Sequence, residues 1–155
     1  MEPTLVEHEG GTAVGHDVRT RNQDEMEPGK GRIPSLWERF SREGVAGRVQ
    51  GKRQPETTVG VYSDYDSDHT GYYTLMVGML TEPAAPVPAG MKKVAIPAGK
   101  YLVFRAEGEM PAALIQTWIA IWKYFGETTD VKRKYLVDFE VYQAAGPVDV
   151  YVSVE

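Results

Sequence analysis

The order of expected secondary structure repeats in the two halves of this 155-residue chain, and the repeat restricts the possible folds more than any single motif does. Alternating apolar residues predict strands, and apolar residues spaced three or four positions apart predict helices. On these criteria each half, about residues 3–82 and 91–155, consists of strand, strand, helix, strand, strand. We therefore expect a single α+β domain over residues 1–155. It would contain two such units, with antiparallel sheets and one helix each, related by a pseudo-twofold axis.

Turns that contain glycine and proline separate the expected elements. A segment with three prolines, residues 82–90, divides the halves because proline cannot pair inside a sheet. In the first half we expect a hairpin of strands 5–8 and 12–19 turning at Gly10-Gly11, a loop at 22–32, a helix at 34–42, a loop at 44–55, and strands at 57–65 and 72–81. In the second half we expect strands at 91–96 and 100–106, a helix at 111–125, and strands at 135–142 and 148–154.

Several residues of the two halves correspond in pairs: Gly11 with Gly99, Trp37 with Trp118, and Val59 with Val137. On the last correspondence, Tyr62 falls opposite Glu140 across the seam between the halves. Pockets favour interfaces between substructures. We therefore expect a concave binding site at this seam.

Near the C-terminal end, residues 137–142 alternate strictly between apolar and polar side chains, which is typical of a half-buried strand. One face is expected to contact a core through Val137, Phe139 and Val141, and the opposite face to carry Asp138, Glu140 and Tyr142. A carboxylate flanked by aromatic rings can bind a cation or titrate abnormally. The alternative is that Glu140 simply points into solvent, as most strand carboxylates do.

Composition excludes several classes of protein. A net charge of −5 argues against a nucleic-acid partner, which would need clustered Lys and Arg. The chain has no cysteine, which excludes disulfides, thiol catalysis and Cys-ligated metals. Its start carries no secretory signal, and no run of about 18 apolar residues would span a membrane. We therefore expect a cytoplasmic protein.

Other candidate sites match known motifs poorly, and we expect neither a metal nor a cofactor. The three histidines are far apart and lack carboxylates at ligand spacing. Residues 64–68 begin like a calcium loop, but His69 stands where glycine is needed and Leu75 where the bidentate Glu belongs. We expect a solvated turn there. The basic runs 92–93 and 132–134 are expected to be solvated strand ends.

Several segments together carry a family resemblance. Ile96-Pro97-Ala98-Gly99-Lys100-Tyr101-Leu102-Val103-Phe104, then residues 108–111 and Thr117-Trp118, resemble the second half of the GyrI-like effector-binding domain family. Residues 138–142 and 148–152 resemble its C-terminal strands, and residues 59–62, 71–73 and 77–78 fit its first half. The resemblance covers about residues 3–154 and implies a tandem SHS2-like fold.

The family occurs as the ligand-sensing half of AraC- and MerR-type transcription regulators and as stand-alone proteins, and includes the gyrase inhibitory protein. In its multidrug-sensing members, a buried carboxylate on the strand that matches residues 139–142 meets cationic aromatic ligands. Glu140 stands at that position here. Only two helices are expected, so no helix-turn-helix fits, and a transcriptional role would need a partner chain.

The resemblance implies a ligand site in which Glu140 supplies charge and aromatic rings supply faces for a cation. Such faces are worth about 0.5–2 kcal/mol each. The candidate aromatic residues are Tyr62, Trp37, Trp118, Tyr142 and Tyr151. The alternative for Trp37 and Trp118, which lie at helical spacing among apolar residues, is packing in the core. We expect Trp122 to be structural.

Three classes of function follow from the resemblance. The first is a stand-alone protein that binds small amphipathic, cationic aromatic compounds. The second is a hydrolase of reactive, cyclopropane-bearing molecules, in which a Glu with a nearby Tyr activates water. The third is a protein-directed inhibitor, for example of DNA gyrase, which would have a protein partner.

Overall fold

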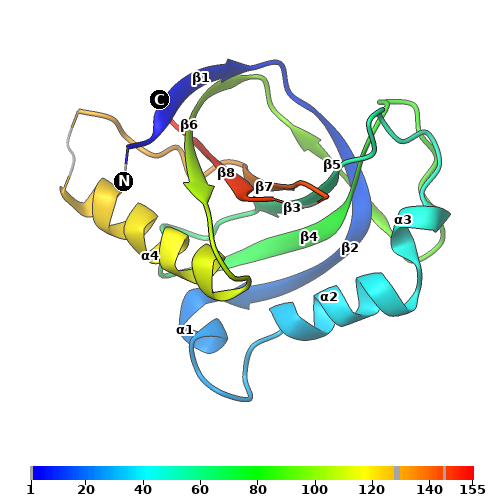
Figure 1. Cartoon of the computed structure of the whole chain (residues 1–155), viewed down its shortest axis with the longest axis horizontal. Helices are drawn as coiled ribbons and strands as arrows, with labels where there is room; N and C mark the ends of the chain where they lie inside the picture. The colour runs from blue at the N-terminus through cyan, green and yellow to red at the C-terminus, as the bar shows by residue number, and fades with distance from the viewer. Residues whose placement is uncertain (1, 128–129, 145) are drawn as a thin grey trace.

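In the part of the chain that the structure describes, eight strands form one curved antiparallel sheet, and the helices lie on its outer side (Figure 1). The computed structural model describes residues 2–127, 130–144 and 146–155. The strands are β1 (Thr4–His8), β2 (Gly11–Arg21), β3 (Thr58–Ser63), β4 (Tyr72–Thr81), β5 (Lys92–Ile96), β6 (Gly99–Ala106), β7 (Asp138–Tyr142) and β8 (Val148–Ser153). The helices are α1 (Asn22–Glu25), α2 (Ile33–Arg42), α3 (Val45–Arg48) and α4 (Ala112–Glu127).

The strand order, β1-β6-β8-β7-β3-β4-β2-β5, reflects the repeat seen in the sequence. Exchanging each strand of the first half with its counterpart in the second half (β1 with β5, β2 with β6, β3 with β7, β4 with β8) reproduces the same order in reverse. The α+β fold with two equivalent units is therefore confirmed. The two units share one continuous sheet because β3 pairs with β7, with Val61 opposite Phe139 at the centre of symmetry.

The expected hairpin at the N-terminus is wrong. Within the described residues β1 pairs with β6, where His8 lies opposite Gly99, and β2 pairs with β5, where Gly11 lies opposite Ile96. Gly10 makes this exchange possible: its φ is +82°, and a Cβ added there would lie 2.6 Å from the Ile96 carbonyl oxygen. The first strand of each half therefore pairs with the second strand of the other half, which interlocks the units.

Two segments expected to be loops each contain one short helix. In residues 22–32 the helix α1 begins directly after β2, and the Met26 amide donates to the Asn22 carbonyl at 3.0 Å. In residues 44–55 the helix α3 places Val45 and Val49 against the sheet, where both are buried. Each helix has only four residues, too few to show a helical apolar pattern in the sequence.

The alternation in residues 137–142 separates two cores. Val137, Phe139 and Val141 face the inside of the curved sheet, whose apolar side chains come from all eight strands. Asp138 and Glu140 face the helices, where Leu36 of α2 and Trp118 of α4 pack. The grouping of faces agrees with the expectation, but β7 is covered on both sides, and Glu140 is only 1% exposed.

The basic run 132–134 was expected to be a solvated strand end, but one of its residues is buried. Arg133 is buried, and its Nη2 donates to Asp138 Oδ2 at 2.8 Å. The guanidinium lies 4.4 Å from the centre of the Tyr135 ring, and Asp138 Oδ1 also accepts from the Ser153 amide at 2.8 Å. This pairing joins the segment before β7 to β8.

Among the described helices, none is both long and apolar enough to cross a membrane.

We expect Asp138→Asn to destabilise the protein by about 3–5 kcal/mol, because it leaves the Arg133 guanidinium buried without a counter-charge. The matched control is Glu38→Gln, which breaks the exposed Glu38–Arg42 pair and should cost less than about 1 kcal/mol. Urea unfolding at neutral pH measures both. Similar midpoints for the two variants would contradict a structural role for the buried pair.

Candidate functional site

A pocket of about 640 Å³ lies between the sheet and the helices, over the pairing of β3 with β7. Side chains from β3, β4, β7, α1, α2 and α4 line it, and most of the lining is apolar. Its aromatic side chains are Trp37, Tyr62, Tyr65, His69, Tyr73, Trp118, Trp122 and Tyr142. Its charged side chains are Glu25, Arg133 and Glu140.

The Glu140 carboxylate accepts three hydrogen bonds from uncharged groups. The Tyr62 hydroxyl and the Trp118 indole N–H each donate to Oε2 at 2.7 Å. The Tyr142 hydroxyl donates to Oε1, also at 2.7 Å. Burial raises the pKa of Glu140, and the three hydrogen bonds oppose that rise because they favour the charged form. Burial also raises the pKa of Tyr62 and of Tyr142, so both remain protonated donors.

Glycine 60 makes room for this carboxylate. Gly60 lies opposite Glu140 in the β3–β7 ladder, and a Cβ added to it would lie 2.8 Å from Oε1. Any larger residue would force the carboxylate away from Tyr142 or out of the plane of its donors. Gly60 was not among the residues predicted for the site, although a glycine inside a strand often marks a close approach.

Five of the six proposed ligand-binding residues line the pocket. The repeat predicted Tyr62 opposite Glu140, but Gly60 holds that position in the ladder. Tyr62 lies opposite Asp138 and reaches Glu140 diagonally through its hydroxyl. The Trp37 ring lies 4.9 Å from the ring of Tyr142, edge to face. The five are Glu140, Tyr62, Trp37, Trp118 and Tyr142, and Trp122, which was expected to be structural, lines the pocket as well.

Tyr151 lies on the other face of the sheet, away from this pocket. Its ring stacks on Phe139 at 4.5 Å between centroids, next to His8. The reason is the alternation of β8, in which Val150 and Val152 pack toward the helices and the residue between them faces inward. Tyr151 is therefore not part of the candidate site.

Several other residues line the pocket that were not predicted for the site, among them Tyr73 and Glu25. Tyr73 belongs to the same alternating set as Leu75 and Val77, so its face was readable from the sequence. Its hydroxyl donates to Asn22 Oδ1 at 2.9 Å. The position of Glu25 in the pocket could not be predicted from strand alternation, because Glu25 lies in the short helix α1.

The charges of the pocket do not cancel. Arg133 is neutralised by Asp138 at 2.8 Å. Within the part of the chain that the structure describes, Glu140 forms no salt bridge, and its three partners are neutral. An ionised Glu140 therefore leaves a negative charge behind an aromatic surface.

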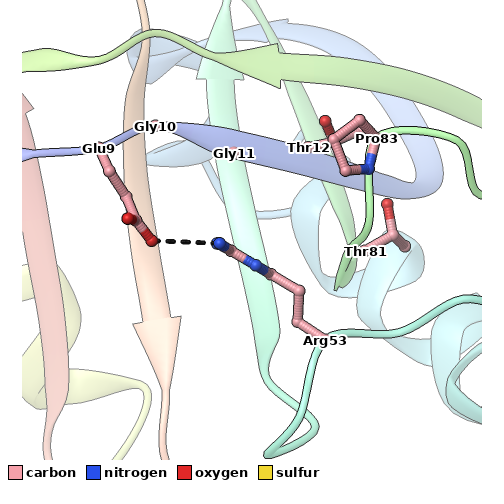
Figure 2. A pocket seen from close by; sticks show the side chains of 7 residues that line it. All are labelled: Glu9, Gly10, Gly11, Thr12, Arg53, Thr81 and Pro83. Atoms are coloured by element: carbon pink, nitrogen blue, oxygen red, sulfur yellow. Dashed lines mark hydrogen bonds and ion pairs between the residues drawn. The ribbon is translucent and has the colours of Figure 1, made fainter.

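A second, smaller pocket of about 370 Å³ lies where β1 leads into β2 (Figure 2). Arg53 and Glu9 face each other across it and pair at 3.1 Å, and the rest of the lining is backbone, threonine and proline. It has no aromatic lining and its charges balance. Among the described residues, no cluster of three or more His, Asp or Glu side chains could hold a metal ion.

Known proteins resemble this chain over most of its length. The chain is 32% identical to an integron cassette protein of Vibrio cholerae, with 99% of this chain and 95% of that chain covered and a TM-score of 0.83. It is 29% identical over 151 residues to YobU of Bacillus subtilis (strain 168), covering 92% of this chain and 91% of YobU. The structure of SAV2435 bound to tetraphenylphosphonium has the same fold, with 22% identity, coverage of 100% and 94%, and a TM-score of 0.79.

Residues 4–154 match the family of integron-associated effector binding proteins, which is GyrI-like, so the resemblance stated above is confirmed. The match includes both halves of the repeat and every strand of the pocket floor. The chain belongs to the family of integron-associated effector binding proteins.

Proposed function

We propose that this protein binds hydrophobic, aromatic cations in the pocket over the β3–β7 pairing, as a stand-alone effector-binding protein. One observation carries the proposal: a carboxylate that is 1% exposed has three neutral hydrogen-bond partners and, among the described residues, no counter-charge. Burying an uncompensated charge is costly, and a bound cation would offset that cost. The site thus favours a ligand that brings positive charge.

The aromatic lining suits the same ligand. A cation beside the face of Trp or Tyr gains about 0.5–2 kcal/mol, more where water is excluded. Trp37 and Tyr142 form one wall, and Tyr62 with Trp118 forms another, with ring centroids 5.0 Å apart in the second pair. A volume of about 640 Å³ lies within the ordinary range for small-molecule sites.

The pocket entrance supports an amphipathic ligand. Met26, Met110 and Ile115 line the pocket, yet their exposed fractions are 51%, 41% and 44%. Methionine adapts to ligands of different shape because its side chain is unbranched and polarizable. The tetraphenylphosphonium complex of SAV2435, which shares the fold, supports the choice of a hydrophobic cation as the first compound to test.

A second candidate function is hydrolysis of small molecules that carry a reactive cyclopropane ring. The observation that favours it is the Tyr62 hydroxyl held 2.7 Å from Glu140 Oε2 inside the pocket, since a carboxylate with a nearby hydroxyl can activate water. Chromatography of such a compound after incubation with the protein tests it. Ring-opened product that requires Glu140 would favour this function over binding alone.

We expect Glu140→Gln to weaken tetraphenylphosphonium binding by about tenfold to a hundredfold, which corresponds to a charge–charge attraction of about 1–3 kcal/mol across a partly dry pocket. Glutamine keeps the shape and can accept from Tyr62 and Trp118, so binding of neutral triphenylphosphine oxide should change little. Isothermal titration calorimetry measures both compounds, with Glu38→Gln as a surface control. Equal losses for the cation and the neutral compound would make the carboxylate structural.

Cation affinity should also depend on pH. Burial raises the pKa of Glu140, so protonation removes its charge at a higher pH than for an ordinary glutamate. Tetraphenylphosphonium does not titrate, so its affinity should fall as the pH is lowered from about 8 to about 5. Glu140→Gln should remove most of this dependence. An unchanged pH profile in the variant would assign the dependence to another group.

A further inference from the structure

We propose that the pocket selects cations without N–H groups, such as quaternary ammonium and phosphonium ions, over protonated amines of the same shape. This inference rests on the proposed function and narrows its ligand class. It follows from how the acceptor oxygens of the pocket are used. The proposal concerns selectivity among cations, which depends on hydrogen bonding as well as on charge.

Protein donors occupy most of the Glu140 carboxylate. A carboxylate oxygen accepts about two hydrogen bonds. Oε2 already accepts from Tyr62 and Trp118, and Oε1 accepts from Tyr142. One accepting position therefore remains, on Oε1.

That remaining position lies on the oxygen beside the β3 backbone at Gly60. The whole Glu140 residue is 1% exposed, and Oε1 lies against Gly60, within 2.8 Å of where a Cβ would stand. The carboxylate thus lies behind its own donors. A ligand ammonium that takes any of the three occupied accepting positions must displace Tyr142, Tyr62 or Trp118.

The other carboxylate of the pocket, on the half-buried Glu25, also accepts from protein donors. Glu25 Oε2 accepts from the Thr20 hydroxyl at 2.6 Å and from the Arg32 amide at 2.8 Å, and Oε1 accepts from the Ile33 amide at 3.2 Å. These bonds hold the start of α2. A ligand N–H would therefore compete with protein donors at either carboxylate.

This arrangement penalises a protonated amine. Its N–H groups leave water on binding, and a buried donor without a partner costs free energy. A quaternary cation has no donor to satisfy, and both its charge and its aromatic groups remain attracted to the ring faces. Glu140 then acts through its charge, across the tyrosine and tryptophan side chains, without direct contact.

A matched ligand pair tests the proposal. Dibenzyldimethylammonium and protonated dibenzylamine carry the same two rings and the same charge at neutral pH, and quenching of tryptophan fluorescence or calorimetry measures both. In the natural protein the quaternary compound should bind at least about tenfold tighter. Equal affinities, or tighter binding of the amine, would overturn the selectivity while leaving a Glu140-dependent cation site intact.

A variant tests the cause of the selectivity. Tyr142→Phe keeps the ring and removes the donor to Oε1, which frees an acceptor for a ligand N–H. The amine should gain affinity relative to the quaternary compound, so the preference should shrink at least about threefold or reverse. Tyr124→Phe, on the part of α4 that packs against Phe104, is the control and should leave the preference unchanged.

The experiments distinguish failure of the proposed cation-binding function from failure of the selectivity for cations without N–H groups. If neither dibenzyl compound nor tetraphenylphosphonium binds, the proposed function is wrong and the inference falls with it. If tetraphenylphosphonium binds and weakens in Glu140→Gln, but the dibenzyl pair shows no preference, only the inference is wrong. Circular dichroism checks that Tyr142→Phe is folded, and the preference measured in the natural protein tests the proposal without that variant.

Discussion

The buried Glu140 carboxylate is the constraint on which the rest of this structure depends. A charge with 1% exposure needs polar partners, and here they come from β3, from α4 and from β7 itself. Trp118 therefore lies over the β3–β7 pairing, and its indole N–H links α4 to Glu140. Gly60 must lack a side chain for the same reason. One side chain of α4 and one glycine of β3 thus serve a single acidic group.

The repeat explains how such a site arises from two similar units. Tyr62 and Glu140 occupy corresponding positions on β3 and β7, the two strands that meet at the centre of the sheet. One unit contributes the donor and the other the acceptor, so the symmetry of the backbone is broken by one pair of side chains. The exchange of β1 and β5 between the units, visible at the top of Figure 1, holds the halves together around this pair.

Much of this could be predicted from the sequence, where the pattern is local. The strand alternation around Phe139 separated the two faces of β7, and the repeat placed Tyr62 across the seam from Glu140. Features that depend on contacts between residues far apart in the sequence could not be predicted. Alternation identifies a strand but not its partner, so the hairpin at Gly10 was wrong. Arg133 looked like part of a solvated basic run because its partner Asp138 meets it only through tertiary packing, and Tyr151 was assigned to the wrong face.

The most direct test of this account is the ionisation of Glu140, read from the ¹³C chemical shift of its side-chain carboxyl during a pH titration. The account predicts an ionised carboxylate at neutral pH, with a titration midpoint above that of an ordinary glutamate. Saturating tetraphenylphosphonium should move the midpoint to lower pH, because a bound cation stabilises the charged form. A carboxyl that is protonated at neutral pH, or a midpoint that the ligand leaves unmoved, would contradict the account.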